Sequence, residues 1–378
     1  MKIGILTFHN NENRGSILQA YCLKESLEDL IEGADAEVID YRTISHEILR
    51  IASKNPIEVI KNIKSRSRTE KEFSKLNILS KNRKITNNYQ KAVNFLSEQN
   101  YDMIIVGSDT IWKIDKKKSL NRPFPNVYFL DESIDAIKVS YAASANKTYL
   151  EELKDSERRL FENKIKSFDK ISVRDNYTEK ILNKIGIKDF KRVPDPTILT
   201  EIPTKDISEI FEKNEISLDK PIISINRVKK DFMEEVISDY KSKGYQIISP
   251  TKHPLADVNL YSKLSPFEYY SLYDYFDLSI TGSLHSTIFS IKNKTPFVTI
   301  ETSNKYKKAE DSKTHSLLKD FEMMSRYIDG INKKPENLLN KVKKCEKDLD
   351  EEKIEKKLSK LKEEGQSYIK ELGKMLND

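Results

Sequence analysis

Short, strongly apolar segments alternate with amphipathic helical segments along both halves of the chain, and this alternation limits the folds it can adopt. In the first half the apolar segments are residues 2–8, 36–41, 101–109, 137–144 and 168–175. In the second half they are residues 221–226, 245–250, 277–283 and 296–300. Strand–helix–strand repetition is typical of parallel sheets covered by helices. We therefore predict an α/β fold with two Rossmann-like, doubly wound domains that face a cleft.

The length of the chain, 378 residues, also favours two domains over a single core. A polar connection over residues 200–220 marks the boundary. We predict an N-terminal domain over 1–205 that includes a helical basic insert at 46–99, and a C-terminal domain over 206–330. Residues 331–378 are rich in Lys, Glu, Asp and Leu and predict one long, solvated, charged helix.

Several classes of protein are excluded by the composition. No apolar run reaches the roughly 18 residues of a membrane-spanning helix, and the first apolar run is too short for the core of a signal peptide. Cys22 and Cys345 lie far apart, which predicts free thiols in a reducing compartment. We expect a cytoplasmic protein, with the inner face of the cell membrane as an alternative location.

Positive charge is concentrated between Lys54 and Lys91. This stretch holds eleven Lys and Arg against three Glu, a local charge of +8 compared with +6 for the whole chain. It is either a solvated helical surface or a patch that makes peripheral contact with an anionic membrane or a lipid-linked phosphate. Few aromatic residues and no nucleic-acid motif accompany it, so we expect no nucleic-acid partner.

Ligands bind doubly wound sheets at the carboxyl ends of the strands, so polar residues just after strands are the candidates for a site. The loop and helix start that follow the first strand suit an acceptor sugar or a phosphate, although helix capping is an equal alternative. The candidates are His9, Asn10, Asn13, Gly15, Ser16 and Gln19. The spacing of glycines is not that of a dinucleotide-binding loop.

A second loop follows the apolar strand at 101–109. Ser108 and Asp109 stand at its end, where a partly desolvated carboxylate can act as an acid, a base or a hydroxyl clamp. Trp112 can stack on a sugar ring. The alternatives are a helix cap for Asp109 and a core position for Trp112. Arg174 directly follows another strand and can bind a carboxylate or phosphate, or pair with Asp175 or Asp195.

A third loop gives the best candidate for an anion site. Ser283, Ser286 and Thr287 surround His285 at a predicted helix start, where free N–H groups, hydroxyls and an imidazole come together. Lys305 and Lys313 follow downstream and either reach the same site or remain solvated. The other histidines show no metal-ligand spacing, so we predict no metal and no cofactor.

Taken in order, these segments resemble the polysaccharide pyruvyl transferase family over roughly residues 1–330. The similar strings are TFHNNENRGSILQAYCL, IIVGSDTIW, YAAS, ISVRD, VPDPTIL and ITGSLHSTIFSIKNKTPFV. The chain departs from the family pattern at Arg14, Thr110, Leu284 and Lys313.

The resemblance implies a fold of the GT-B glycosyltransferase type and an enzyme that moves the enolpyruvyl unit of phosphoenolpyruvate onto two hydroxyls of a sugar. The product would be a pyruvate ketal on a cell-surface polysaccharide precursor, such as an exopolysaccharide or cell-wall glycan. By position, His285 would transfer a proton or assist phosphate departure, and Arg174 and Lys305 would hold the carboxylate or phosphate. Asp109 and the first loop would face the glycan or lipid-linked acceptor.

Ketal formation needs a proton donor for the enol carbon, cations for two anionic groups and a base for each sugar hydroxyl. The residues after the predicted strands offer all three. Two alternatives remain: a nucleotide-sugar glycosyltransferase of the same architecture, and a non-catalytic scaffold that keeps the fold.

Overall fold

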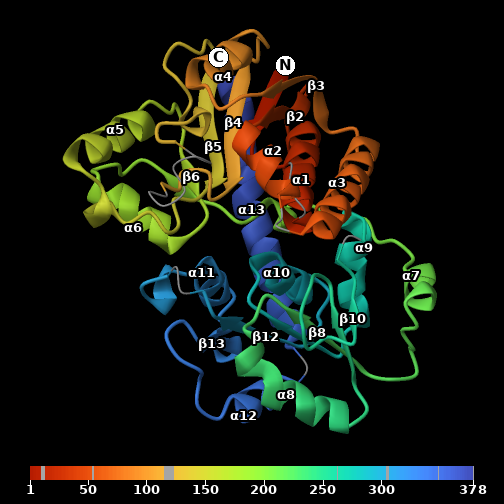
Figure 1. Ribbon diagram of the computed structural model, residues 1–378. Coiled ribbons are helices and arrows are strands. Elements are labelled where there is room, and N and C mark those ends of the chain that lie inside the picture. The colour runs from red at the N-terminus through yellow and green to blue at the C-terminus, as the bar shows by residue number, and fades with distance from the viewer. Residues whose placement is uncertain are drawn as a thin grey trace. The chain divides into compact units, whose positions relative to one another are not determined.

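The computed structural model describes residues 1–9, 13–52, 55–114, 123–261, 263–303, 306–347 and 349–377. They form two compact units (Figure 1). Unit 1 comprises Met1–Glu201 together with Lys360–Asp378, and unit 2 comprises Ile202–Ser359.

Unit 1 is a parallel sheet covered by helices on both faces. Within the described residues its seven strands are in the order β3-β2-β1-β4-β5-β6-β7. The strands are β1 (Lys2–Leu6), β2 (Asp35–Arg42), β3 (Leu79–Ile85), β4 (Met103–Asp109), β5 (Ile137–Ala143), β6 (Ser172–Val173) and β7 (Lys191–Arg192). The helices that begin and end inside it are α1 (Arg14–Leu30), α2 (Ile44–Ile51), α3 (Pro56–Lys75), α4 (Tyr89–Ser97), α5 (Asp155–Lys166) and α6 (Asn176–Lys184).

The centre of this sheet is buried on both faces. Met103, Ile104, Ile105 and Val106 of β4 have no exposed surface. Ile104 and Val106 belong to one apolar cluster with α4 and α6, whereas Met103 and Ile105 belong to another with α1. This two-sided burial explains why the strand is apolar at every position rather than at alternate ones.

The predicted helical insert at 46–99 is interrupted by a strand, which is a correction to the sequence interpretation. α2, α3 and α4 are helical, but Leu79–Ile85 forms β3 and pairs in parallel with β2. β3 is the outermost strand and most of its residues are exposed or half-buried. Charged residues are typical of such edge strands, so its sequence, LSKNRKI, lacks the apolar signal of the central strands.

Unit 2 repeats the same topology with fewer strands. Its sheet, as far as the structure describes it, has six parallel strands in the order β10-β9-β8-β11-β12-β13. They are β8 (Ile222–Asn226), β9 (Gln246–Ser249), β10 (Val258–Asn259), β11 (Leu278–Thr281), β12 (Phe297–Glu301) and β13 (Tyr327–Asp329). The helices are α7 (Ser208–Lys213), α8 (Lys230–Ser242), α9 (Pro266–Ser271), α10 (Leu284–Lys292), α11 (Lys313–Asp320) and α12 (Leu338–Lys343).

Both strand orders reverse direction beside the first strand of the sheet, between β1 and β4 and between β8 and β11. This reversal defines a doubly wound sheet, so the predicted fold class is confirmed. It also locates the point in each unit where the carboxyl ends of neighbouring strands separate and leave room for a ligand.

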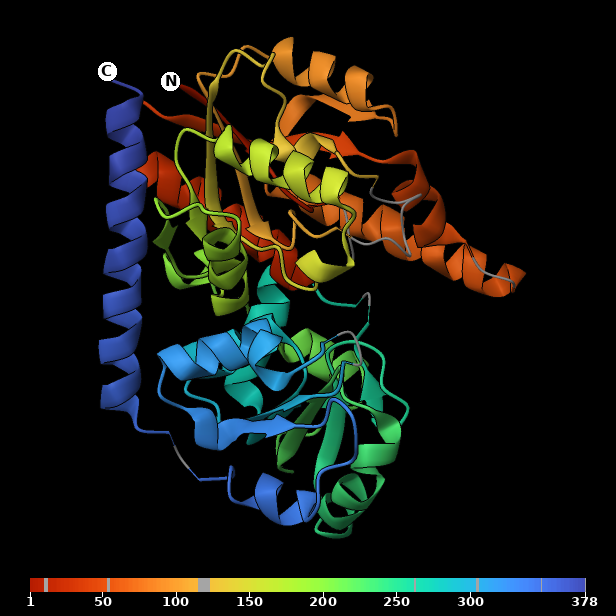
Figure 2. The same cartoon turned by 90° about the vertical axis from the view of Figure 1, so that its left-hand side faces the viewer.

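The predicted single charged helix at 331–378 is two helices, and one of them is not simply solvated. α12 is short, and α13 (Glu351–Met375) begins in unit 2 and ends in unit 1. Tyr368, Ile369 and Leu372 of α13 are fully buried in the same apolar cluster as α1 (Figure 2). Their spacing of one to four residues gives α13 one apolar stripe among its lysines and glutamates.

Gly365 permits the close packing of α13 in unit 1. A Cβ atom on Gly365 would lie 2.4 Å from Leu199 Cδ2 and 2.8 Å from Tyr141 Oη. A glycine in the middle of a helix normally lowers its stability. Here it lets the helix backbone approach the core.

Candidate functional site

The carboxyl ends of β1, β4 and β6 in unit 1 bring together a buried polar cluster. Ser108 is its centre: its Oγ accepts from Gln19 Nε2 at 2.8 Å and from Arg174 Nη1 at 3.2 Å. Gln19 and Arg174 also both donate to Asp195 Oδ2, at 2.5 and 2.7 Å. Gln19 of α1 and Arg174 after β6 thus share the hydroxyl of Ser108 in β4 and the carboxylate of Asp195.

Arg174 is the most constrained charge of this cluster, with its side chain 5% exposed. Burial alone would lower the pKa of Arg174, but Asp195, Asp109 and Asp175 raise it above its ordinary value. The guanidinium therefore stays charged. Its Nε and Nη2 atoms are buried and make no hydrogen bond with the described residues. The pairing with Asp195 is the structural alternative that the sequence left open for Arg174.

Asp109 is the more accessible acid of the cluster. Its side chain is 15% exposed, and its Oδ1 lies 3.7 Å from Arg174 Nη2 and accepts from the Thr110 N–H at 2.7 Å. The structure thus brings together Asp109 and Arg174, which lie 65 residues apart in sequence. A partly exposed carboxylate beside a fixed cation can bind or deprotonate a hydroxyl.

Most residues of the first loop have internal partners rather than a free surface. His9 is 2% exposed, and its ring nitrogens lie 3.2 Å from Thr7 O and 3.1 Å from Asp40 Oδ1. Ser16 is buried and accepts from Asn13 Nδ2 at 2.8 Å. Gly15 was expected in the loop, but α1 already starts at Arg14. Asn10 lies outside the described residues.

The sequence predicted that His9, Ser16 and Gln19 contact a sugar directly. The burial of these side chains corrects that prediction. Their polar atoms are engaged inside unit 1: His9 contacts Asp40 of β2, Ser16 accepts from the N-cap residue of its own helix, and Gln19 joins α1 to β4. Asn13 is the N-cap residue of α1 and half-buried, so it remains a candidate.

The predicted stacking role of Trp112 is also contradicted. Its side chain has no exposed surface, and its ring packs edge-to-face on Phe168 with centroids 5.4 Å apart. Trp112 is a core residue of unit 1, the alternative that the sequence left open.

In unit 2 the loop after β11 lies beside the reversal of strand order. Gly282 permits close packing here, since a Cβ atom would lie 2.4 Å from Arg227 O and 3.0 Å from Ile300 O. The ends of β8, β11 and β12 therefore converge on this glycine. α10 starts directly after it.

Ser283 is the N-cap residue of α10 but makes no side-chain capping hydrogen bond. The first N–H groups of α10 are therefore not capped by Ser283, and the helix dipole favours an anion there. His285, in the first turn, is 4% exposed and its ring lies 6.1 Å from that of Phe289. The structure places Ser283 and His285 together at the carboxyl edge of this sheet, as predicted.

The predicted anion-binding role of Ser286 and Thr287 is corrected, because their hydroxyls form hydrogen bonds inside unit 2. Ser286 Oγ accepts from Asn226 Nδ2 at 2.7 Å and from Tyr273 Oη at 2.6 Å. Thr287 Oγ1 donates to Ser283 O at 3.0 Å and lies 2.9 Å from Thr299 Oγ1. Both are fully buried, so they position the start of α10 and do not themselves bind an anion.

Of the two downstream lysines, the structure describes Lys313. Lys313 is half-buried and is the first residue of α11, next to Ser312, whose hydroxyl donates to Glu301 Oε2 at 2.7 Å. Lys305 lies outside the described residues.

Sequence reasoning missed two carboxyl-edge residues that organise these loops. Asp40 near the end of β2 accepts from Arg42 and Arg83 and contacts His9. Burial would raise the pKa of Asp40, but these hydrogen bonds hold it well below its usual value. Asn226, the last residue of β8, joins Ser286 to Thr251. Asp40 and Asn226 would both have been found if polar residues at the carboxyl end of every strand had been taken as candidates.

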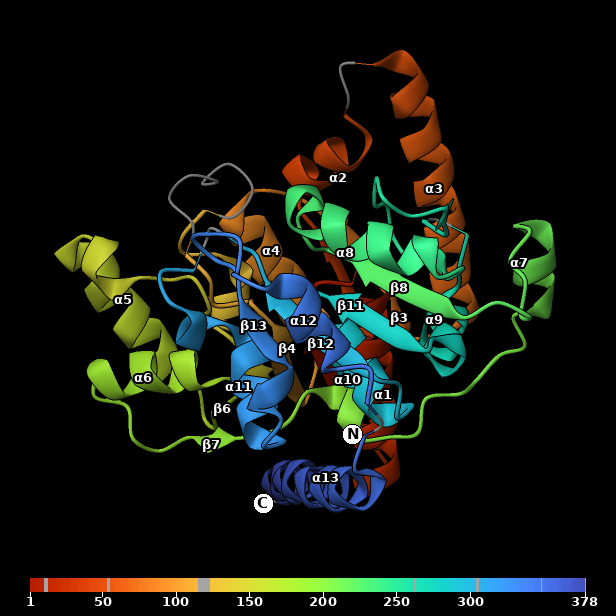
Figure 3. The same ribbon diagram turned by 90° about the horizontal axis from the view of Figure 1, so that it is seen from below.

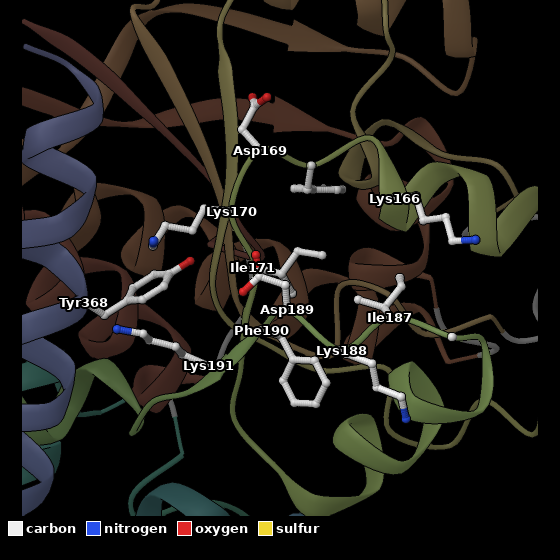
Figure 4. Close-up of a pocket in the computed structure, with 12 residues that line it drawn as sticks. Lys166, Asp169, Lys170, Ile171, Ile187, Lys188, Asp189, Phe190, Lys191 and Tyr368 are labelled. Atoms are coloured by element: carbon white, nitrogen blue, oxygen red, sulfur yellow. The ribbon is translucent and has the colours of Figure 1, made fainter. Parts of the chain in front are cut away.

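A pocket of about 290 Å³ lies elsewhere in unit 1, before the amino ends of β6 and β7 (Figure 4). Lys166, Lys170, Lys188 and Lys191 line it, but so do Asp169 and Asp189. Lys170 and Lys191 also pair with Glu371 of α13. Its lining therefore carries four positive and two negative side chains, and it lies at the opposite end of the strands from Asp109 and Arg174.

The described residues contain no cluster of three His, Cys, Asp or Glu side chains arranged to hold a metal ion. None of the described helices combines the length and apolar character needed to cross a bilayer.

Comparison with known families assigns the chain. The model of the polysaccharide pyruvyl transferase family matches residues 13–304, so the chain belongs to this family. Among curated proteins, none matches the chain in sequence.

Solved structures with the same fold are distant in sequence. The chain resembles S. aureus MnaA in a co-structure with UDP, at 13% identity and a TM-score of 0.50, over 95% of this chain and 90% of that one. It also resembles UDP-GlcNAc 2-epimerase from Neisseria meningitidis bound to UDP-GlcNAc, at 11% identity and a TM-score of 0.53, over 98% and 99%. These likenesses establish the GT-B-like fold.

Proposed function

We propose that the protein transfers the enolpyruvyl unit of phosphoenolpyruvate to a sugar of a cell-surface polysaccharide precursor and forms a pyruvate ketal. The observation that carries the proposal is the start of α10, where Ser283 leaves the helix N-terminus without a side-chain cap and His285 stands in the first turn. Membership of the pyruvyl transferase family supports the same reaction class.

The reaction requires one proton on carbon and two bonds to sugar oxygens. The methylene carbon of phosphoenolpyruvate gains a proton and becomes a methyl group. Both sugar hydroxyls add to the central carbon, and the phosphate leaves as hydrogen phosphate. Of the two hydroxyl protons, one balances the new methyl group and the other leaves with the phosphate.

The residues take complementary parts in this scheme. The N–H groups at the start of α10 and Ser283 bind the phosphate, and His285 transfers the proton. Asp109 accepts a proton from a sugar hydroxyl, and the neighbouring Arg174 binds the carboxylate of the donor. Lys313 and Lys305 add positive charge for the donor, and Asn13 contacts the acceptor.

The test is incubation with phosphoenolpyruvate and a panel of glycan acceptors while phosphate release is measured. His285→Ala should lower the rate by roughly 10²–10⁴, the usual contribution of a proton-transfer group. His315→Ala is the matched control, because His315 lies in α11 of the same unit and packs on Tyr327. A rate unchanged by His285→Ala would remove this residue from the mechanism.

A second candidate, a nucleotide-sugar enzyme, is favoured by the two structural neighbours solved with UDP or UDP-GlcNAc. Ligands that bind the folded state raise the melting temperature. Stabilisation by UDP and not by phosphoenolpyruvate would support this candidate over pyruvyl transfer.

A further inference from the structure

Helices α2 and α3 carry an unusual concentration of exposed isoleucine. Among the described residues nine large apolar side chains are well exposed, and five of them are Ile44, Ile48, Ile57, Ile60 and Ile63. Single exposed apolar residues are normal on a protein surface, but a group on two packed helices marks an interaction surface. α2 and α3 lie next to one another at one end of unit 1 (Figure 3).

The outward side of α3 is apolar in its first turns and basic afterwards. Spacings of three, four, seven and four residues place one set of exposed side chains on the same side of the helix. This set is Ile57, Ile60, Lys64, Lys71 and Lys75. The opposite side holds the less exposed Val59, Arg66 and Glu70, again at spacings of seven and four.

Two acidic side chains that the structure describes near this surface, Glu70 and Glu47, are paired with arginines. Glu70 accepts from Arg42 Nη1 at 2.8 Å and from Arg66 Nε at 3.2 Å. Glu47 of α2 is buried and pairs with Arg66. These pairs neutralise the carboxylates within unit 1. Lys64, Lys71 and Lys75 make no ion pair with any described residue, so the outward side keeps their positive charge.

We propose that the α2–α3 surface binds the polar face of a lipid bilayer that contains anionic lipids. The isoleucines would enter the boundary between headgroups and acyl chains, and the three lysines would lie at the level of the lipid phosphates. Figure 2 shows α3 extending away from the sheet of unit 1, and the residues of its outward side are exposed. The surface would hold the enzyme where lipid-linked sugars are found.

Two other partners fit this surface less well. A second copy of the chain would bring the lysine rows together, and like charges repel. A nucleic acid would match the lysines, but the exposed side chains beside them are isoleucines, which cannot stack on bases as aromatic residues do.

The first experiment measures co-sedimentation of the full chain with phosphatidylcholine vesicles that contain either no or about 30% phosphatidylglycerol. Lys64→Gln/Lys71→Gln/Lys75→Gln should weaken binding to the anionic vesicles by about 100-fold at low salt. Ile48→Ser/Ile57→Ser/Ile60→Ser should weaken it by at least about tenfold, with little dependence on salt. Leu218→Ser, a control that removes an apolar side chain 61% exposed in unit 2, should have no effect.

The second experiment places an environment-sensitive dye on Ile60→Cys, which is practicable because Cys22 and Cys345 are both buried. Anionic vesicles should shift the emission of this dye to the blue, and the same dye on Leu218→Cys should not respond. Circular dichroism and the melting temperature establish that each variant is folded.

Three results would overturn the inference: no binding of the wild-type chain to anionic vesicles, equal binding to neutral ones, or binding that survives both triple substitutions. Isoleucine-dependent dimers or lysine-dependent binding to an oligonucleotide, each without vesicle binding, would assign the surface to those partners instead. Since no phosphoenolpyruvate is present, these results are independent of whether the proposed reaction is correct.

Discussion

The carboxyl edges of the two sheets share a topology but differ in chemistry. In unit 1 the edge is ionic, with Arg174 held between Asp195 and Asp109. In unit 2 the network at the start of α10 is neutral, and Ser286 joins Asn226 to Tyr273 through hydroxyl and amide groups, whereas the charged Glu301 stands at the end of β12.

This difference suits the two kinds of substrate group in the proposed reaction. A buried ion pair fixes a carboxylate in its charged form, which suits a base for a neutral sugar hydroxyl. A neutral network around a helix start leaves the partial positive charge of the helix uncompensated, which suits a phosphate. For the proposed reaction, the comparison favours the sugar hydroxyls at Asp109 and the phosphate of the donor at the start of α10, and the following predictions test the difference between the two edges from the largest effect to the smallest.

Removal of Arg174 should be the most damaging single change. Arg174→Met leaves Asp195 and Asp109 without their buried cation, and breaking a buried pair in this way costs about 3–5 kcal/mol of unfolding free energy. Denaturant titration of the wild type and the variant measures this loss.

The double variant Arg174→Met/Asp195→Asn is the control for stranded charge. It should recover part of the lost stability, because the neutral amide no longer needs a cation. Equal stabilities of the single and double variants would show that the edge of unit 1 does not depend on this ion pair.

The packing of α13 distinguishes the units further, because it completes the core of unit 1. Gly365→Ala should destabilise by about 1–3 kcal/mol, since the new methyl group would overlap Leu199 and Tyr141. Gly373→Ala is the matched control: its nearest neighbour, Ile31 Cγ1, lies 3.2 Å away, and alanine favours the helix. If both variants unfold at the same denaturant concentration, the close approach at Gly365 is not tight.

Disruption of the neutral network at the start of α10 should cost less unfolding free energy than the removal of Arg174. Ser286→Ala leaves the Tyr273 hydroxyl and the Asn226 amide without their shared acceptor, a loss of about 1–3 kcal/mol. Ser290→Ala in the same helix removes only a bond to the Ser286 carbonyl and should cost less. The reverse order, again from denaturant unfolding, would contradict the role assigned to Ser286.

Acid should weaken unit 2 through His253. Burial lowers the pKa of His253, although its hydrogen bond to Val228 O opposes the shift. The unfolded chain therefore binds a proton near pH 6.5 that the folded chain resists, and stability falls as the pH drops below that value. Unfolding free energies at pH 7.5 and 5.5 should differ less in His253→Asn than in the wild type.

The fold was predictable because its signals are local, whereas much of the site was not. The all-apolar segment Met103–Val106 indicated a buried strand, and the expectation that ligands bind just after strands placed Asp109, Arg174 and Ser283 at the carboxyl edges of the sheets. β3 escaped because an edge strand needs no apolar pattern. Trp112 and Ser286 were misassigned because exposure depends on neighbours such as Phe168 and Tyr273, which are distant in sequence.

The path of α13 has a consequence for biosynthesis. Tyr368, Ile369 and Leu372 cover apolar surface of a unit whose strands are made first, yet the ribosome must translate all of unit 2 before it reaches them. A nascent chain will therefore carry an incomplete first unit while the second is already complete. The apolar surface that α13 later covers is then exposed and can bind chaperones. A premature stop before Lys360 would leave every candidate of the acceptor side in place and still yield an aggregation-prone product.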